Sequence, residues 1–347
     1  MTVSTAQKAT LDYPVQRPPE PGTTYEIVPG VHWVRMPLPF PPDHINLWLL
    51  ADGEAFAIVD CGLARDDTKQ LWEQVFATTL GGRPVTRLFV THFHPDHLGL
   101  AQWLIERCSM PLYMTVNEWL IARTVHGHGT EADLANRVAF YRANGLDGER
   151  LAPFQQPGNP YRRGVPEVPA AFRRLQGGVS FGLGGREWVP VIGRGHAPEH
   201  ACLWCPDLNL IIGGDILLPR ISPNVSVWPS EPLANPLAEY LGSLANFADL
   251  PDDVLVLPAH GLPYRGVHTR IAELRAHHQQ RLDHLVHTLA TPHSAADCFR
   301  YLFRREIHAG NMALALGESL AHLHMLEEQG RVGRTMGDDG VLRFVRV

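Results

Sequence analysis

The sequence has few cysteines, and their placement excludes a disulfide framework. Five cysteines, an odd number, are scattered over 347 residues. Secreted domains held by disulfides usually carry an even number at close spacings. Cys202 and Cys205 form a C-x-x-C spacing, but they lie in an apolar, strand-like segment without a second pair, so we interpret them as core thiols. This cysteine content favours a reducing compartment, and we expect a cytoplasmic protein.

Long apolar runs are also missing. No stretch of about 18 apolar residues occurs, so the sequence predicts no transmembrane helix and no membrane partner. The first residues have no basic region followed by an apolar core, so we expect no secretory signal peptide. Residues 1–23 end in a proline-rich stretch, which predicts an extended arm on the surface.

Positive charge is not in excess. The 30 Lys and Arg residues face 36 Asp and Glu residues, for a formal net charge of −6, and lysine occurs only at Lys8 and Lys69. Such a chain has no general attraction to nucleic acid or to an anionic membrane. With 45% hydrophobic and 19% charged residues it has the composition of a globular protein, long enough for one large domain or two smaller ones.

The first half of the chain alternates strand and helix patterns. Residues 24–60 hold four β-rich runs separated by turn signals, which predict antiparallel strands. Helical spacing follows over 66–80, then an apolar strand over 87–90, a helix, and another strand over 111–116. Strands that feed helices in series predict an α/β layer architecture.

Residues 117–178 interrupt this alternation. They begin with helical patterns and continue into a segment rich in proline and glycine. A long irregular stretch inside a compact domain is usually a lid or a binding loop. Between 121 and 175 the chain carries eight Arg against five Asp and Glu. The segment is therefore either a solvated surface element or a lid that offers arginine to an anionic part of a substrate.

The pattern changes again after residue 266. Helical periodicity predicts a long amphipathic helix over 267–290 and two further helices over 294–303 and 312–330. A GDDG turn at 337–340 predicts a terminal hairpin. We therefore expect a catalytic domain over 24–266 and a small helical module over 267–347.

A dense cluster of metal ligands occupies THFHPDH, residues 91–97. His92 and His94 are two apart, so on extended backbone they project to the same side and can share one ion. Asp96 and His97 follow Pro95, which breaks that geometry, and can face a second ion. The cluster lies between an apolar strand and a helix, where α/β sheets place their sites. Imidazole with carboxylate suits zinc, and also iron, manganese or cobalt.

A site for two ions needs further ligands, and three lone candidates follow apolar, strand-like runs. His196 comes after VPVIG, Asp215 after LIIGG, and His260 after VLVLP. Each of them alone would more often be a core or surface residue. Together with THFHPDH they form a series of ligands at the ends of four strands.

The motifs THFHPDH, GHAPEH, GGD and PAHG occur in this order. They resemble the motif set of the metallo-β-lactamase fold hydrolases, whose signature is H-x-H-x-D-H, and IVDCG at 58–62 resembles the aspartate-containing turn of that family. The resemblance covers about residues 24–265. It implies a four-layer αβ/βα sandwich with two metal ions at one edge.

The resemblance also implies a role for each ligand. His92, His94 and His196 would hold the first ion, and Asp96, His97 and His260 the second. Asp215 would bridge two Zn²⁺ ions per chain, with iron or manganese as alternatives. Asp96 would in addition orient the attacking hydroxide. His200 is either an outer residue that orients a ligand or a satisfied polar residue in its strand.

The C-terminal module resembles the winged-helix-like C-terminal domain of the β-lactamase-like protein 2 group, which includes a ribonuclease. The expected recognition helix over 312–330 contains three Glu and neither Lys nor Arg. A helix that enters a nucleic-acid groove needs phosphate contacts. We therefore expect no nucleic-acid partner, and a module that packs on the sandwich or forms a homodimer contact.

These patterns favour hydrolysis of a small-molecule ester, thioester or lactone by a hydroxide that bridges two metals. If the segment 117–178 is a lid that offers arginine, the substrate is expected to be anionic. A phosphodiesterase or endoribonuclease with the same metals is the first alternative. An iron-dependent sulfur dioxygenase is a second, although its relatives lack the full second ion site, and a regulatory binding protein is a third. Tyr264, near His260, and the HLH segment at 322–324 are interpreted as structural.

Overall fold

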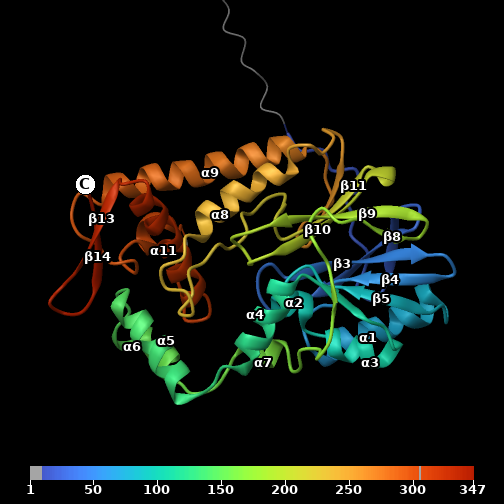
Figure 1. Ribbon diagram of the computed structural model, residues 1–347, viewed down its shortest axis with the longest axis horizontal. Coiled ribbons are helices and arrows are strands. Elements are labelled where there is room, and N and C mark those ends of the chain that lie inside the picture. The colour runs from blue at the N-terminus through green and yellow to red at the C-terminus, as the bar shows by residue number, and fades with distance from the viewer. Residues whose placement is uncertain (1–9, 305) are drawn as a thin grey trace, which may run out of the picture.

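The computed structural model describes residues 10–304 and 306–347 and shows two β-sheets packed face to face, with helices on both outer sides (Figure 1). Neighbouring strands of the first sheet follow the chain, in the order β1-β2-β3-β4-β5-β6-β7, and the second sheet has the order β12-β11-β10-β9-β8. The strands of the first sheet are β1 (Thr24–Val28), β2 (Val31–Pro37), β3 (His44–Asp52), β4 (Ala55–Val59), β5 (Val85–Phe89), β6 (Leu112–Met114) and β7 (Arg173–Arg174). Those of the second are β8 (Phe181–Leu183), β9 (Arg186–Gly193), β10 (His200–Cys205), β11 (Leu210–Gly214) and β12 (Leu255–Pro258).

Helices cover the first sheet on one side and the second sheet on the other. The helices of the first half are α1 (Asp66–Val75), which continues as a π-helical segment over Phe76–Leu80, α2 (Pro95–Leu98), α3 (Ala101–Cys108), α4 (Val116–Gly127), α5 (Glu131–Ala143), α6 (Gly148–Leu151) and α7 (Tyr161–Gly164). Those of the second half are α8 (Pro236–Ser243), α9 (Val267–Thr288), α10 (Phe299–Leu302) and α11 (Met312–Glu328), followed by the hairpin of β13 (Val332–Met336) and β14 (Leu342–Arg346). The expected α/β four-layer sandwich with a small C-terminal module is confirmed.

The alternation of side chains along β3 shows how the layers form. Ile45, Leu47 and Leu49 enter the core beneath α1 and α3. Trp48 and Leu50, which point to the opposite face, enter the core between the two sheets. A strand buried on both faces needs apolar residues at successive positions, which is why INLWLLA reads as one continuous apolar run.

The C-terminal helices share a core with the second sheet. One cluster of buried residues runs from β11 and β12 through α8 and α9 to α11 and the terminal hairpin. Helix α11 is buried along most of its length and lies beside α8 and α9 (Figure 1). The module therefore packs on the sandwich, and a boundary of folding units at residue 266 stays a prediction.

One of the three expected C-terminal helices is confirmed only in part. Only residues 299–302 of the predicted 294–303 are helical. The backbone N–H of Ala296 donates to the Asn144 carbonyl (3.1 Å), and the side chains of Ser294 and Asp297 bond each other's backbone N–H groups. The Ser294–Asp297 pair is a capping arrangement that starts a helical turn. The chain then continues in tight turns, in which the N–H groups of Cys298 and Phe299 donate to carbonyls three residues back, before the short helix α10. The helices at 267–290 and 312–330 and the hairpin are confirmed.

The segment 117–178 connects the first sheet to the C-terminal module. Phe140, Tyr141, Leu146 and Leu151 of its middle part belong to the core of the C-terminal helices. Several of its arginines are bound internally, such as Arg137, which donates to three backbone carbonyls. A lid role for this segment stays a prediction.

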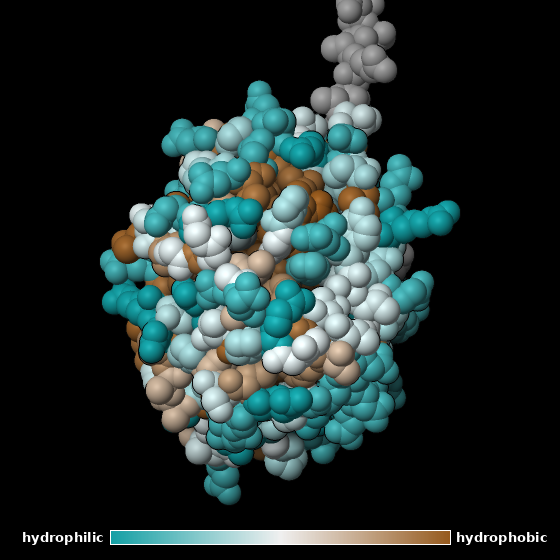
Figure 2. Space-filling model, turned by 90° about the vertical axis from the view of Figure 1, so that its right-hand side faces the viewer, coloured by the Kyte–Doolittle hydropathy of each residue, from teal (hydrophilic) through white to brown (hydrophobic). Residues whose placement is uncertain are grey.

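The surface is mixed in character. Figure 2 shows a mainly hydrophilic face, with hydrophobic residues in patches between the polar ones. Isolated exposed apolar residues such as Leu233 are ordinary for globular proteins. Among residues 10–304 and 306–347, no helix combines the length and the apolar character that crossing a bilayer requires.

Candidate metal centre

The candidate ligands converge because the strands that precede them run in matching directions. In the second sheet β10 is antiparallel to both of its neighbours, β9 and β11, and β11 is parallel to β12. Strands β9, β11 and β12 therefore run in the same direction, and their carboxyl ends lie at one edge of the sheet. His196, Asp215 and His260 follow these ends. The first sheet delivers residues 91–97 after β5 to the same edge, where Thr91 accepts a backbone hydrogen bond from Ala201 of β10 (2.9 Å).

The seven expected ligands form two groups. Their candidate ligand atoms lie within 4.8 Å of one another in each group. The first group is His92, His94, His196 and Asp215, and the second is Asp96, His97 and His260. The arrangement is consistent with a dinuclear metal site.

Asp215 lies between the two groups. Its Oδ2 is 3.3 Å from His196 Nε2 in the first group. Its Oδ1 is 3.5 Å from both His97 Nε2 and His260 Nε2 in the second. Asp96 closes the second group, with Oδ2 3.4 Å from His260 Nε2. Asp215 would therefore be able to offer one oxygen to an ion in each group.

Two buried polar atoms show that the site fits metal ions. His97 Nε2 and Asp215 Oδ1 are shielded from solvent and have no hydrogen-bond partner within the described part of the chain. Buried polar atoms without partners are rare in native structures and indicate a missing ligand, water or ion. The two atoms lie 3.5 Å from each other, where the two groups meet, and both are good donors to a divalent metal.

The ring nitrogen opposite each metal-facing nitrogen is held by the fold. His97 Nδ1 lies 2.8 Å from Asp60 Oδ2. His196 Nδ1 is 2.7 Å from the Asn224 carbonyl, and His260 Nδ1 is 2.7 Å from the His44 carbonyl. Such outer contacts select the tautomer that leaves Nε2 free to bind metal.

Neighbouring charges set the protonation of the site. Burial raises the pKa of Asp96, but His97 and a hydrogen bond from His260 outweigh it and lower that pKa below its usual range. The same histidines outweigh burial at Asp215 and bring its pKa well below the usual value. Burial lowers the pKa of His94 to about 3. At His97 and His260 the neighbouring carboxylates outweigh burial and raise the pKa, so a metal ion would displace protons from these two rings on binding.

His200 supports the site from the start of β10. Its ring stacks on that of His92, with centroids 4.7 Å apart, and its Nε2 accepts a hydrogen bond from the backbone N–H of Asp215 (3.2 Å). A Cβ on Gly214, where φ is +49°, would lie 2.4 Å from the His200 ring. The glycine before Asp215 thus leaves room for the His200 ring. Tyr264 is buried and donates to the Leu217 carbonyl (3.2 Å), as a structural residue would.

Three residues that support the ligands have no role assigned from the sequence. In the sequence, Asp60 is noted only as part of the IVDCG turn. A carboxylate directly after an apolar strand is nevertheless a pattern that indicates a site residue. His44 accepts a hydrogen bond from the N–H of Gly261, beside His260 (2.9 Å). Glu118 accepts one from the N–H of Phe93, between His92 and His94 (3.0 Å). Neither His44 nor Glu118 stands in a pattern that reveals its contact.

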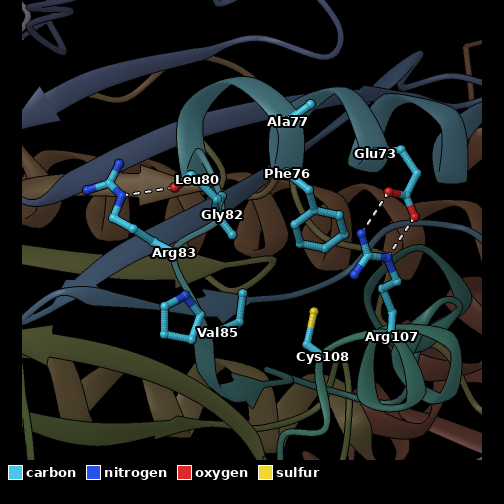
Figure 3. Close-up of a pocket in the computed structure, with 10 residues that line it drawn as sticks. Glu73, Phe76, Ala77, Leu80, Gly82, Arg83, Val85, Arg107 and Cys108 are labelled. Atoms are coloured by element: carbon cyan, nitrogen blue, oxygen red, sulfur yellow. Dashed lines mark hydrogen bonds and ion pairs between the residues drawn. The ribbon is translucent and has the colours of Figure 1, made fainter.

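A separate hollow lies between α1, the turn at 81–84 and the end of α3 (Figure 3). None of the seven ligands lines it. Arg107 donates to both carboxylate oxygens of Glu73 (3.0 and 3.1 Å), and Arg83 donates to the carbonyls of Thr79 and Leu80. The cations of this hollow are thus already engaged by the protein.

Comparison with protein families identifies both parts of the chain. The model of the metallo-beta-lactamase superfamily matches residues 40–260. The model of the metallo-beta-lactamase-like C-terminal domain matches residues 282–347. The first match contains all seven candidate ligands.

Individual relatives resemble the chain over most of its length. A crystal structure of a beta-lactamase domain protein from Burkholderia ambifaria is 44% identical, covers 97% of this chain and 98% of its own, and superposes with a TM-score of 0.86. A metallo-beta-lactamase family protein from Thermus thermophilus is 29% identical, covers 92% of this chain and 100% of its own, and has a TM-score of 0.77. The probable metallo-hydrolase YqjP of Bacillus subtilis is 25% identical over 85% of this chain and 92% of its own length.

Proposed function

The chain belongs to the metallo-β-lactamase superfamily, and from this premise we propose that it hydrolyses a small ester, thioester or lactone at a dinuclear metal site. The observation that carries the proposal is Asp215, whose two oxygens face different ligand groups. A full second group distinguishes the site from one built for a single ion. Metallo-hydrolase chemistry also agrees with the name of the relative YqjP.

Each part of the site has a task in this proposal. Two divalent ions, when bound, would lower the pKa of a water molecule and polarise the electrophilic oxygen of the substrate. Asp215 holds the two ligand groups in register. Asp96 is the carboxylate of the site with the more exposed side chain, 17% against 9% for Asp215. It is therefore placed to orient the nucleophile and to accept its proton.

The proposal specifies zinc at both ion positions. Three histidines with one carboxylate, and two histidines with two carboxylates counting Asp215, are donor sets that zinc accepts. Iron or manganese accepts the same donors. Metal analysis of the purified protein should give two ions per chain. A single iron per chain would instead favour the sulfur dioxygenase.

A nuclease with the same metals remains the competing function. Helix α11, the counterpart of a recognition helix, is buried along most of its length and carries neither Lys nor Arg. A buried acidic helix supplies no phosphate contacts. This favours a small-molecule substrate over nucleic acid.

We also propose that the protein works in the cytoplasm. All five cysteines are free, and four of them are buried. Thiols of this kind persist where the environment is reducing.

A substrate panel tests the proposed function. The zinc-loaded protein is assayed on thioesters, lactones, p-nitrophenyl esters, β-lactams, bis-p-nitrophenyl phosphate and single-stranded RNA, each with and without chelator. We expect chelator-sensitive turnover on at least one of the first three classes. Turnover confined to the phosphodiester substrates would replace the proposal with the nuclease.

Replacement of Asp96 tests its role. Asp96→Asn should lower kcat on the best substrate by about 100-fold or more, because it removes the proton acceptor and weakens a ligand. Asp66→Asn, at an exposed position in the first turn of α1, is the matched control and should leave kcat unchanged. Metal content and thermal unfolding are measured for both variants. Full activity of Asp96→Asn with two bound ions would contradict the role.

A further inference from the structure

The backbone of Phe93, between His92 and His94, is held at both of its polar groups. Its N–H donates to Glu118 Oε2 (3.0 Å). Its carbonyl accepts a hydrogen bond from the hydroxyl of Tyr161 (2.6 Å). Glu118 and Tyr161 both come from the segment 117–178. The two histidines on either side of Phe93 both belong to the first ligand group.

The same carboxylate holds the third histidine of that group. Glu118 Oε1 accepts a hydrogen bond from the backbone N–H of Glu199 (2.6 Å), in the loop that carries His196. The hydroxyl of Thr115, at the start of α4, donates to the Glu199 carbonyl (2.8 Å). Glu118 thus joins the loop of His92 and His94 to the loop of His196.

Glu118 is placed at a considerable energetic cost. Its side chain is fully buried, and no ion pair to it occurs in the described part of the chain. Burial raises the pKa of Glu118 to about 7, while the two backbone N–H groups oppose that rise. A buried carboxylate without a cation is costly. Because both oxygens accept from N–H groups, an unprotonated carboxylate is the form that satisfies both loops.

Helix α7, which carries Tyr161, packs directly against the ligand loop. A Cβ on Gly164 would lie 2.6 Å from Cβ of Pro95, and the Gly164 carbonyl accepts a hydrogen bond from Ala64 (3.3 Å). The Phe93 and Tyr161 rings lie 6.2 Å apart. The Tyr161 hydroxyl is thus fixed beside the loop by packing as well as by its hydrogen bond.

The second ligand group has different supports. His97 is held by Asp60, and the chain beside His260 is held by His44. Both supports come from the first sheet and its connections, before residue 117. Asp60 also accepts hydrogen bonds from the backbone N–H and the hydroxyl of Thr91, and that hydroxyl lies 3.0 Å from His92 Nδ1. His44 is therefore the support of the second group to compare with the contacts that the segment 117–178 makes to the loops of the first.

We propose that Glu118, assisted by Tyr161, is a positioning residue that sets the geometry of the three histidines around the first ion. The segment 117–178 thereby controls the affinity of the first ion separately from that of the second. This goes beyond the proposed hydrolysis and needs no substrate to test.

The probe is Co²⁺ titrated into the full-length metal-free protein, with visible absorption as the readout of ligand geometry. His94→Ala and His260→Ala serve as reference variants that assign the two binding steps to the first and second ions. Glu118→Gln keeps the size of the side chain but turns a donor group toward one of the two N–H groups. Tyr161→Phe removes a single hydroxyl.

We expect Glu118→Gln to weaken the first binding site by about 10- to 100-fold and to shift its Co²⁺ absorption, with the second site within about threefold of wild type. Tyr161→Phe should change the same site in the same direction by a smaller factor. His44→Ala is the matched control, because His44 holds the backbone beside His260 of the second group. This variant should weaken the second site instead.

Two outcomes would overturn the proposal. One is wild-type Co²⁺ affinity and spectra in both variants. The other is an equal loss at both sites, which would mark Glu118 as a general structural residue. If Glu118→Gln does not fold, as judged by circular dichroism of the metal-free protein, Tyr161→Phe alone decides between these results.

Discussion

At the scale of single residues, the candidate metal ligands could be predicted from the sequence, but the residues that hold the ligand loops could not. The ligands are metal-binding residue types directly after apolar strands, and such positions meet at one sheet edge. Glu118 could not be found in this way. A glutamate in the first turn of a helix is favoured by the helix dipole on any exposed surface. Only the packing shows that its side chain turns inward to two loops.

Another pair of residues is buried without a role in the chemistry. His278 of α9 and His322 of α11 lie with Nδ1 and Nε2 3.3 Å apart, and His322 Nδ1 also contacts the Glu318 carbonyl (2.8 Å). Burial lowers the pKa of His278 to about 2 and that of His322 to about 3. The HLH segment is structural, as expected, and both rings stay neutral in the folded protein.

This pair should make the protein sensitive to acid. Above pH 6.5 neither the folded nor the unfolded chain protonates these rings, so the pair has no effect. Below pH 6.5 the unfolded chain takes up protons that the folded chain refuses, and stability falls. Between pH 7.5 and 5 the loss should be about 2 kcal/mol for each histidine. Urea unfolding of the metal-free protein across this range measures it.

The double variant His278→Leu/His322→Leu is the comparison. The variant keeps every other titratable group. The difference between the two proteins in how their free energy of unfolding falls below pH 6.5 is therefore due to the two histidines. The variant should lose less stability on acidification. Parallel curves for the two proteins would show that the rings protonate in the folded state.

At the scale of elements, helix α11 approaches a ligand-supporting loop through a glycine. A Cβ on Gly317 would lie 2.6 Å from Cβ of Ser226, and the Gly317 carbonyl accepts a hydrogen bond from Val227 (3.1 Å). The same loop includes Asn224, whose carbonyl contacts His196. The C-terminal module thus connects to His196 of the first ligand group through two successive contacts.

Gly317→Ala should therefore lower both stability and metal affinity. Overpacking at such a contact costs about 1 to 3 kcal/mol, and the displaced loop would shift the carbonyl that orients His196. Gly242→Ala in α8 is the matched control, because a Cβ there meets nothing within 4 Å. It should leave stability equal or higher by up to about 1 kcal/mol. Chemical unfolding and Co²⁺ titration follow both variants; a Gly317→Ala protein as stable as wild type would contradict the close contact.

Element boundaries could be predicted where one strong pattern decided them. The double-sided apolar run of β3 and the long periodicity of α9 are such cases. The predicted helix at 294–303 is shortened to Phe299–Leu302, because the N–H groups of Cys298 and Phe299 bond three residues back and form tight turns before it. Helical spacing in the sequence does not distinguish such turns from a full helix.

At the scale of the whole molecule, the C-terminal helices and the second sheet are one packed unit. Their buried residues form a single cluster, which also includes residues of α5 and α6. The layered fold could be predicted because its strands and ligand motifs are local signals. The docking of the middle segment onto the C-terminal module could not, because it depends on apolar residues that would serve equally well against another surface.

A shared core should unfold in one step. Amide protons of α11 and of β11 should exchange with equal free energies of opening under native conditions, because their buried residues belong to one cluster and neither can open without exposing it. Hydrogen exchange followed by mass spectrometry, in the presence of zinc, measures both elements in one sample. Opening of α11 at a free energy several kcal/mol below that of β11 would instead support a separate C-terminal folding unit.

The origin of the ligands has a consequence for the order of events during folding. Each ligand group draws members from both sheets: His92 and His94 join His196 and Asp215, while Asp96 and His97 join His260. Neither half of the sandwich can therefore capture an ion in its final geometry by itself. Metal uptake must follow the docking of the two sheets, and the last ligand, His260, is synthesised long after the first. Bound ions would therefore add their binding free energy to an assembled sandwich rather than start its assembly.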